Sequence, residues 1–289
     1  MRCTTPFSFA LFGLSFILLA GCQNPPAYTS GSTINGASLA ANTNAPSPAP
    51  AVVSAPVITP TPAPVAVVVA SPAALPPVTI HLAGDSTVSN YASTTVQEGW
   101  GMELGQFFND QVTVNNQAQG GANVQSFHNS GRWPAIINAL KPGDYVLIQF
   151  GANDSGTAHG PVYPPQFVET LNAMADEVRA KGAEPIFVTP SAFFDWTPDG
   201  KENNARLAPY AAACYTAGEA KHALVDDLNA RGVEWLNSIG KDTAAPFYLP
   251  NSQHVPDKAH FVKAGAVQMA KMVAGEIKRI NSPLAAYLK

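Results

Sequence analysis

The architecture of this chain follows from one apolar segment that runs into a polar turn, Val78-Thr79-Ile80-His81-Leu82-Ala83-Gly84-Asp85-Ser86-Thr87. Its first six residues predict a buried strand, and the Gly-Asp-Ser-Thr sequence that follows predicts a turn. A turn at that point exposes the hydroxyl of Ser86 at the edge of a sheet. Alternation along the strand makes His81 a packing residue.

Short apolar strands alternate with amphipathic helical stretches through the rest of residues 78–289. This alternation predicts an α/β fold with three layers, in which helices cover both faces of a five-stranded parallel sheet. The predicted strands are 78–83, 111–115, 145–150, 185–189 and 233–236. The predicted helices are 98–108, 133–140, 165–181, 203–231 and 262–280, and Gly232 is expected to end the fourth of them.

The charged residues are unevenly distributed. The chain has 289 residues and a net charge of -4, but it contains no Asp, Glu, Lys or Arg between Arg2 and Asp85. It therefore divides into an uncharged leader and a charged globular body. The slightly acidic balance gives no electrostatic basis for binding nucleic acid, so no nucleic-acid partner is expected.

The leader has the features of a targeting segment. Arg2 precedes an apolar run, residues 7–19, which is too short to span a bilayer as a permanent helix. The run ends at Leu19-Ala20-Gly21-Cys22, which resembles a bacterial lipobox. This predicts a signal peptide over 1–21 and a lipid on Cys22, whereas the alternative is an ordinary secretory signal with a chance cysteine.

A lipid on Cys22 would anchor the protein to the bacterial cell envelope, with the globular domain in the periplasm or outside the cell. Gln23, where an Asp would be a retention signal, favours the outer membrane if the host is Gram-negative. Residues 22–77 are rich in Pro and Ala and predict an extended, disordered linker. The globular domain, 78–289, has Cys214 as its single cysteine and must fold without an internal disulfide; this cysteine is expected in a buried helix.

Four polar blocks follow the strands or precede the last helix: Gly84–Thr87, Asn116–Gly121, Gly151–Asp154 and Asp257–His260. In parallel sheets, sites form at the carboxyl ends of the strands. In this order, the blocks resemble those of the SGNH (GDSL-type) hydrolases, whose four letters correspond to Ser86, Gly121, Asn153 and His260. The resemblance implies a flavodoxin-like sheet.

Further motifs resemble the rhamnogalacturonan acetylesterase branch of these hydrolases, among them Gly99-Trp100-Gly101, Gly131-Arg132 and Asp257-x-x-His260. The resemblance covers nearly all of residues 78–280. It implies a serine esterase that removes O-acetyl groups from a polysaccharide. The expected partner is an acetylated polysaccharide or another acyl ester, and the expected state is a monomer without cofactor or metal.

Ester hydrolysis requires a nucleophile, a base and hydrogen-bond donors for the negative oxygen. We expect Ser86 to be the nucleophile, His260 the base, and Asp257 the carboxylate that orients the ring and supports the imidazolium. The expected oxyanion hole consists of the backbone N–H groups of Ser86 and Gly121 and the side-chain amide of Asn153.

Other titratable residues have less support in the sequence. Asp85 is expected to brace its own turn. His254 is the rival base, but no Asp precedes it at the spacing that links Asp257 to His260. His128, His159 and His222 lack a partner pattern, and their spacing predicts no metal site.

Four residues are candidates for substrate contact: Ala122, Ala152, Phe193 and Trp196. Ala122 stands where many members of the branch carry Arg, and Ala152 where many carry His. We expect these alanines to widen the mouth of the site and, through the loss of a cation, to weaken a preference for acidic polysaccharides. Phe193 and Trp196, with Phe194 between them in the chain, could stack on a sugar ring or serve only as packing.

Two other functions remain open at this point. The first is a lipase, thioesterase or general short-acyl esterase, because the same family acts on many acyl groups. The second is a non-catalytic lipoprotein that binds polysaccharide, against which Ser86, Asp257 and His260 argue.

Replacement of the lipobox cysteine provides a test of anchoring. We expect Cys22→Ser to move the protein from the membrane fraction to the soluble fraction, because the thiol that would carry the lipid is lost. The measurement is fractionation of the host with labelled fatty acid. Wild-type protein that never acquires label would show that the lipobox interpretation is wrong.

Overall fold

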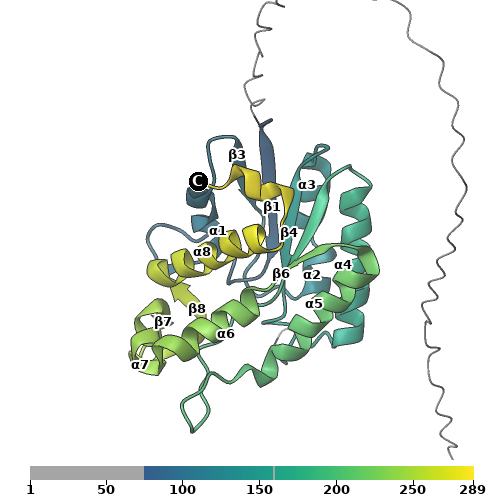
Figure 1. Cartoon of the computed structure of the whole chain (residues 1–289). Coiled ribbons are helices and arrows are strands. Elements are labelled where there is room, and N and C mark those ends of the chain that lie inside the picture. Colours follow the sequence, from purple (N-terminus) through teal and green to yellow (C-terminus); the bar gives the residue numbers. More distant parts are fainter. Residues whose placement is uncertain (1–74, 159) are drawn as a thin grey trace, which may run out of the picture. The chain divides into compact units, whose positions relative to one another are not determined.

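The computed structural model describes residues 75–158 and 160–289 (Figure 1). The predictions made for the signal peptide, Cys22 and the linker up to residue 74 lie outside the described residues, and so does His159. Every element below belongs to the predicted globular domain.

The central sheet has five parallel strands in the order β3-β1-β4-β5-β6. The predicted three-layer α/β fold is thus confirmed, with β1 paired on both sides. Its register places Leu82 opposite Asn116 and Gly84 opposite Gln149, so the carboxyl ends of three strands meet at one edge. The strands are β1 (Val78–Gly84), β3 (Val112–Asn116), β4 (Tyr145–Gln149), β5 (Glu184–Val188) and β6 (Leu224–Asp226).

Helices cover both faces of the sheet (Figure 1). One face is covered by α1 (Trp100–Glu103), α6 (Leu228–Ile239) and α8 (Lys263–Arg279). The other is covered by α2 (Val124–His128), α3 (Arg132–Ala139), α4 (Pro164–Arg179) and α5 (Ala208–Lys221). The remaining helical segments are α7 (Lys241–Ala244) and the 3-10 turns η1 (Leu104–Phe107), η2 (Asn204–Arg206), η3 (Ala245–Phe247) and η4 (Pro283–Tyr287).

Alternation along the strands supplies two separate apolar cores. In β4, Leu147 faces the cluster that contains α8, whereas Val146 and Ile148 face the cluster that contains α4 and α5. All three side chains are buried, as expected for a parallel strand covered by helices on both faces. Cys214 is buried in α5, as predicted, and among the described residues it has no disulfide partner. His81 is also buried, with its Nδ1 atom 3.0 Å from the amide of Asn115.

The prediction of the last strand was wrong. Residues 233–236 lie inside α6, and the fifth strand is β6, within the stretch predicted as one long helix. The helix breaks because the Asp227 side chain accepts the backbone N–H of Ala230 and caps the start of α6. Gly232 does not end a helix; a Cβ there would lie 2.9 Å from that of Ala192, so the glycine permits close packing.

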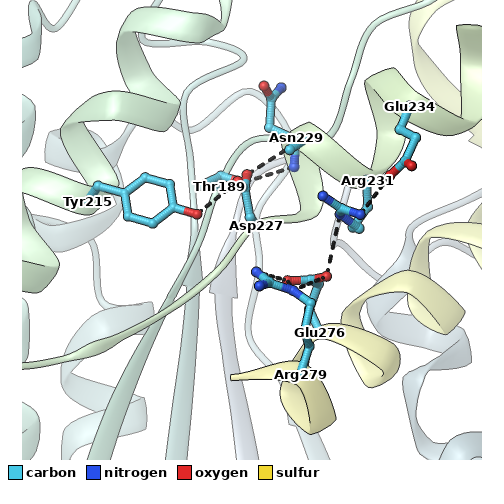
Figure 2. A network of polar contacts seen from close by, with 9 residues as sticks. Thr189, Tyr215, Asp227, Asn229, Arg231, Glu234, Glu276 and Arg279 are labelled. Carbon is cyan, nitrogen blue, oxygen red and sulfur yellow. Dashed lines mark hydrogen bonds and ion pairs between the residues drawn. The ribbon is translucent and has the colours of Figure 1, made fainter. Parts of the chain in front are cut away.

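A network of polar contacts links α6 to its neighbours β5, α5 and α8 (Figure 2). Asp227 accepts hydrogen bonds from the hydroxyls of Thr189 (3.0 Å) and Tyr215 (2.8 Å), which joins β5 and α5 to the start of α6. The buried Glu276 of α8 pairs with Arg279 and lies 3.4 Å from the Nε atom of Arg231 in α6.

A second sheet, which the sequence analysis did not predict, has three antiparallel strands in the order β2-β8-β7. These are β2 (Gln97–Glu98), β7 (Tyr248–Pro250) and β8 (Pro256–Val262). Tyr248 pairs with Phe261 and Pro250 with Pro256, so β8 has more residues between the two pairs than β7. The extra residues bulge from the ladder, and they include both Asp257 and His260.

Among residues 75–158 and 160–289, no helix combines the length and apolar character needed to cross a bilayer.

Two glycines of α8 differ in their surroundings and predict opposite stability changes. A Cβ at Gly265 would lie 2.1 Å from the Phe247 carbonyl oxygen, whereas a Cβ at Gly275 would meet nothing within 4 Å. We expect Gly265→Ala to destabilise the domain by about 1–3 kcal/mol through overpacking. Gly275→Ala should stabilise it by roughly 0.5–1 kcal/mol, because alanine loses less backbone entropy in a helix. Urea unfolding of both variants measures the difference, and equal effects would contradict the described packing of η3 on α8.

Candidate active site

Ser86 lies in a tight turn directly after β1. The Asp85 carboxylate accepts the backbone N–H (2.9 Å) and the hydroxyl (2.8 Å) of Thr87, and the Asp85 carbonyl accepts the N–H of Ser89 (3.1 Å). Asp85 therefore braces the turn, as expected. This bracing leaves the Ser86 side chain half-buried at the carboxyl end of the strand.

Buried polar side chains support the turn of Ser86 through a series of hydrogen bonds. The Trp100 indole donates to the Gln149 oxygen (2.7 Å), and the Gln149 amide donates to the Thr87 hydroxyl (2.9 Å). Thr87 in turn donates to Asp85. Burial raises the pKa of Asp85 to about 6, because the charged carboxylate loses its hydration there.

The structure brings Ser86 together with His260, 174 positions later in the chain. The His260 Nε2 atom lies 3.0 Å from the Ser86 hydroxyl oxygen, and the His260 Nδ1 atom lies 3.1 Å from the Asp257 carboxylate. An ionised carboxylate can only accept hydrogen bonds, so the ring proton belongs on Nδ1. Nε2 is then left to accept the proton of the Ser86 hydroxyl.

The bulge in β8 gives Asp257 and His260 their relative orientation. The Asp257 Oδ1 atom also accepts the backbone N–H groups of Ala259 (2.7 Å) and His260 (3.0 Å). The hydrogen bond from the His260 ring and these backbone donors hold the pKa of Asp257 well below its usual range. The same carboxylate raises the pKa of His260 above 6.5, more than partial burial lowers it.

Two of the three predicted oxyanion donors, Gly121 and Asn153, lie in the loops that follow β3 and β4. A Cβ added at Gly120 would lie 3.9 Å from that of Ser86, so the Gly120–Gly121 backbone runs against the serine. Gly121 has φ 77°, which a residue with a Cβ rarely adopts. The Asn153 side-chain amide donates to the Ala122 carbonyl at 3.0 Å, and its second N–H has no acceptor among the described residues.

A buried carboxylate ties these two loops together. Asp154 accepts the backbone N–H groups of Val124 and Gly151, each at 2.9 Å. Burial raises its pKa to about 7, although both hydrogen bonds act in the opposite direction. The position of Asn153 is therefore coupled to that of Gly121.

The candidate substrate contacts are placed differently from one another. Ala122, Ala152 and Phe193 are buried, with exposed fractions of 6%, 8% and 4%. The methyl groups of the two alanines pack into apolar clusters, so they do not widen the mouth of the site as expected. Trp196 is half-buried and lines a cleft of about 380 Å³ with Asp195, Lys241 and Lys258.

The other histidines that the structure describes take no part in this arrangement. His254 is exposed, in a turn with φ 58°, and the partner of the Ser86 hydroxyl is His260. His128 pairs with Glu177 at 2.8 Å, and His222 is exposed at the end of α5. Within residues 75–158 and 160–289, no three His, Cys, Asp or Glu side chains are grouped so that they could hold a metal ion.

Two residues beside the site were missed by the sequence analysis. The Tyr91 hydroxyl donates to the Ser86 carbonyl at 2.8 Å, and Arg206 donates to the Ala152 carbonyl at 3.1 Å. Neither residue belongs to a recognisable motif, and Arg206 lies 54 positions from its partner. Only the folded chain brings it to the loop after β4.

The sequence and the fold are similar to those of known proteins. The sequence profile of the GDSL-like lipase/acylhydrolase family matches residues 82–266. The probable rhamnogalacturonan acetylesterase YesY of Bacillus subtilis is 33% identical over 212 residues, which cover 71% of this chain and 94% of that protein. The rhamnogalacturonan acetylesterase RhgT of the same organism is 34% identical over 221 residues, covering 73% and 94%.

A solved structure gives the same result. The crystal structure of protein YxiM from Bacillus subtilis superposes with a TM-score of 0.65 at 32% identity, over 71% of this chain and 57% of that one. The chain thus spans little more than half of YxiM but nearly all of YesY and RhgT. It belongs to the GDSL-like lipase/acylhydrolase family, the SGNH hydrolases that its polar blocks resemble, and it is a carboxylic ester hydrolase.

Proposed function

We propose that this protein is a serine esterase that removes O-acetyl groups from a polysaccharide. The observation that carries the proposal is the series of hydrogen bonds from Ser86 through His260 to Asp257. The polysaccharide part rests on the likeness to two relatives that are named rhamnogalacturonan acetylesterases and are matched over 94% of their length.

In the proposed acylation step, Nε2 of His260 takes the proton of the Ser86 hydroxyl while the serine oxygen bonds to the acetyl carbonyl carbon. The imidazolium is stabilised by Asp257, whose carboxylate is already fixed by two backbone donors. His260 then returns the proton to the sugar oxygen as the ester bond breaks, which leaves Ser86 acetylated.

Deacylation repeats the sequence with water. His260 takes a proton from the water as its oxygen attacks the acetyl-serine carbonyl, and then returns the proton to Ser86 as acetate leaves. In both steps the carbonyl oxygen gains negative charge. The proposed donors to it are the N–H groups of Ser86 and Gly121 and the free N–H of Asn153, which are worth most in the transition state.

The cleft beside the catalytic bulge is the proposed binding site for the polysaccharide. Lys258, which follows Asp257, forms an ion pair with Asp195 at 2.8 Å, and both residues line the cleft together with Trp196. An indole face with charged hydrogen-bonding groups beside it suits a sugar ring. Phe193 is buried beneath Arg206 and is better suited to supporting this region than to stacking.

The proposal is tested by acetate release from a panel of acetylated pectins, xylans and peptidoglycan, with p-nitrophenyl esters of increasing chain length. We expect acetate release from at least one glycan and a sharp preference for acetyl over longer chains. Ser86→Ala and His260→Ala should abolish turnover, whereas the control His254→Ala should retain it. A preference for long acyl chains would replace this function with lipid ester hydrolysis, and a wild type inactive on every ester would indicate a binding protein.

The pH dependence of kcat/KM gives a separate prediction. Only neutral His260 can accept a proton, and Asp257 raises the pKa of that ring, so activity should fall as the pH decreases through a midpoint above 6.5. Asp257→Asn removes the charge that raises the pKa, so the residual activity should persist to lower pH. Profiles on p-nitrophenyl acetate measure both midpoints, and a wild-type profile that is flat down to roughly pH 4 would rule out a histidine base.

A further inference from the structure

Arg206 makes several directed contacts at the edge of the site, although it belongs to none of the polar blocks. It ends the short turn η2, just before α5. Its Nε atom donates to the Ser155 hydroxyl at 2.8 Å, and its Nη2 atom donates to the Ala152 carbonyl at 3.1 Å. The guanidinium also lies over the Phe193 ring, 5.2 Å from its centre.

The two hydrogen bonds enclose the residue that carries the proposed oxyanion donor. Ala152 and Ser155 lie on either side of Asn153 in one tight turn, in which Ser155 N–H donates to the Gly151 carbonyl at 3.0 Å. The Ser155 hydroxyl also donates to the Ala152 carbonyl at 2.9 Å. A Cβ at Gly156 would lie 2.7 Å from Nη2 of Arg206, so the turn and the guanidinium are in close contact.

The ring beneath Arg206 connects this turn to the segment that carries the base. Phe193, Ala152 and Leu207 form a small buried cluster, and Ala259 packs against it. Ala259 lies between Asp257 and His260, and Phe194 N–H donates to the Lys258 carbonyl at 2.7 Å. Arg206 therefore holds the Asn153 turn against the same apolar cluster on which the catalytic bulge packs.

The free N–H of Asn153 depends on the orientation of this turn. Within the part of the chain that the structure describes, the side chain has one hydrogen bond, to the Ala122 carbonyl, so its direction follows from that acceptor and from the backbone at 152–155. The Asp154 carboxylate fixes one side of this backbone, and Arg206 fixes the other. A planar guanidinium suits this role because its donors are held in a rigid fork.

We propose that Arg206 is a positioning residue for the oxyanion donor Asn153, which it orients through Ala152 and Ser155 without touching the reacting atoms. This inference rests on the proposed function, because it needs Asn153 to bind the developing negative charge. It predicts a loss that appears in kcat and disappears when Asn153 is absent.

A double-mutant cycle on p-nitrophenyl acetate tests the proposal. Asn153→Ala should lower kcat by about 10²–10³, as expected for one oxyanion donor. Arg206→Ala should lower kcat by roughly 10-fold with KM changed by less than about twofold, since a misdirected donor affects mainly the transition state. In the Asn153→Ala background, Arg206→Ala should have almost no further effect, because the donor that it positions is gone.

Two further variants separate positioning from general stability. Arg206→Lys keeps the charge but loses the fork, so it should recover only part of kcat. The matched control is Arg179→Ala. It removes a guanidinium that donates to the carbonyls of Lys221 and His222, where α4 and α5 end before β5 and β6. The control should shift the melting temperature without changing kcat.

Several outcomes would overturn the inference. Losses that add in the double mutant, or a loss confined to KM, would mean that Arg206 acts directly on the substrate, as a cation for an acidic sugar would. An unchanged kcat in Arg206→Ala, while Ser86→Ala is inactive, would reject the positioning role and leave the esterase proposal intact. If Arg206→Ala fails to fold, Ser155→Ala takes its place, with a smaller loss in kcat that should also vanish without Asn153. A wild type that does not hydrolyse p-nitrophenyl acetate would reject both proposals.

Discussion

The hydrogen bond between Ser86 and His260 is the interaction on which the rest of the site depends. It joins residues 174 positions apart, so two distant segments must end at the same edge of the sheet. β1 meets this requirement because it is paired on both sides and buried on both faces. These contacts fix the position of Ser86 at the carboxyl end of the strand. The second segment, β8, brings His260 to the same edge through its bulge. A regular strand would direct residues 257 and 260 to opposite faces.

The surroundings of this hydrogen bond are fixed by buried polar groups. Asp85 and Asp154 are both fully buried, and burial raises the pKa of each, which means that their ionised forms oppose stability. Each carboxylate nevertheless accepts two hydrogen bonds from the backbone or side chains of the site loops. The fold thus gives up some stability to hold the turn of Ser86 and the loop of Asn153 in one arrangement. The uncharged alternative, a purely apolar support, would leave the loop N–H groups without acceptors.

The sequence predicted the parts of this structure that have a local signal. Four of the five strands contain closely spaced apolar residues, and their bounds were predicted to within one residue. The fifth failed because β6 has only three residues, too few for a pattern, and because Gly232 resembles a helix end when it is in fact a packing contact. The pairing of β8 with β7, and the contact of Arg206 with Ala152, join segments that have no pattern in common. The expectation that Ala122 and Ala152 widen the mouth of the site failed for a related reason. A small residue in the sequence does not reveal which neighbours fill the space around it.

The nucleophile and the oxyanion donors belong to a different part of the fold from the residues that face the cleft. Ser86 and Asn153 follow strands of the central sheet, and a shift of either would disturb both apolar cores. Trp196 and Lys241 come from segments outside that sheet, whereas Pro256 and Lys258 belong to β8, beside and within the catalytic bulge. Under the proposed function, substitutions of Trp196 or Lys241 would change which ester is bound while Ser86 and Asn153 keep their geometry. A separation of this kind allows one fold to carry out ester hydrolysis on different esters.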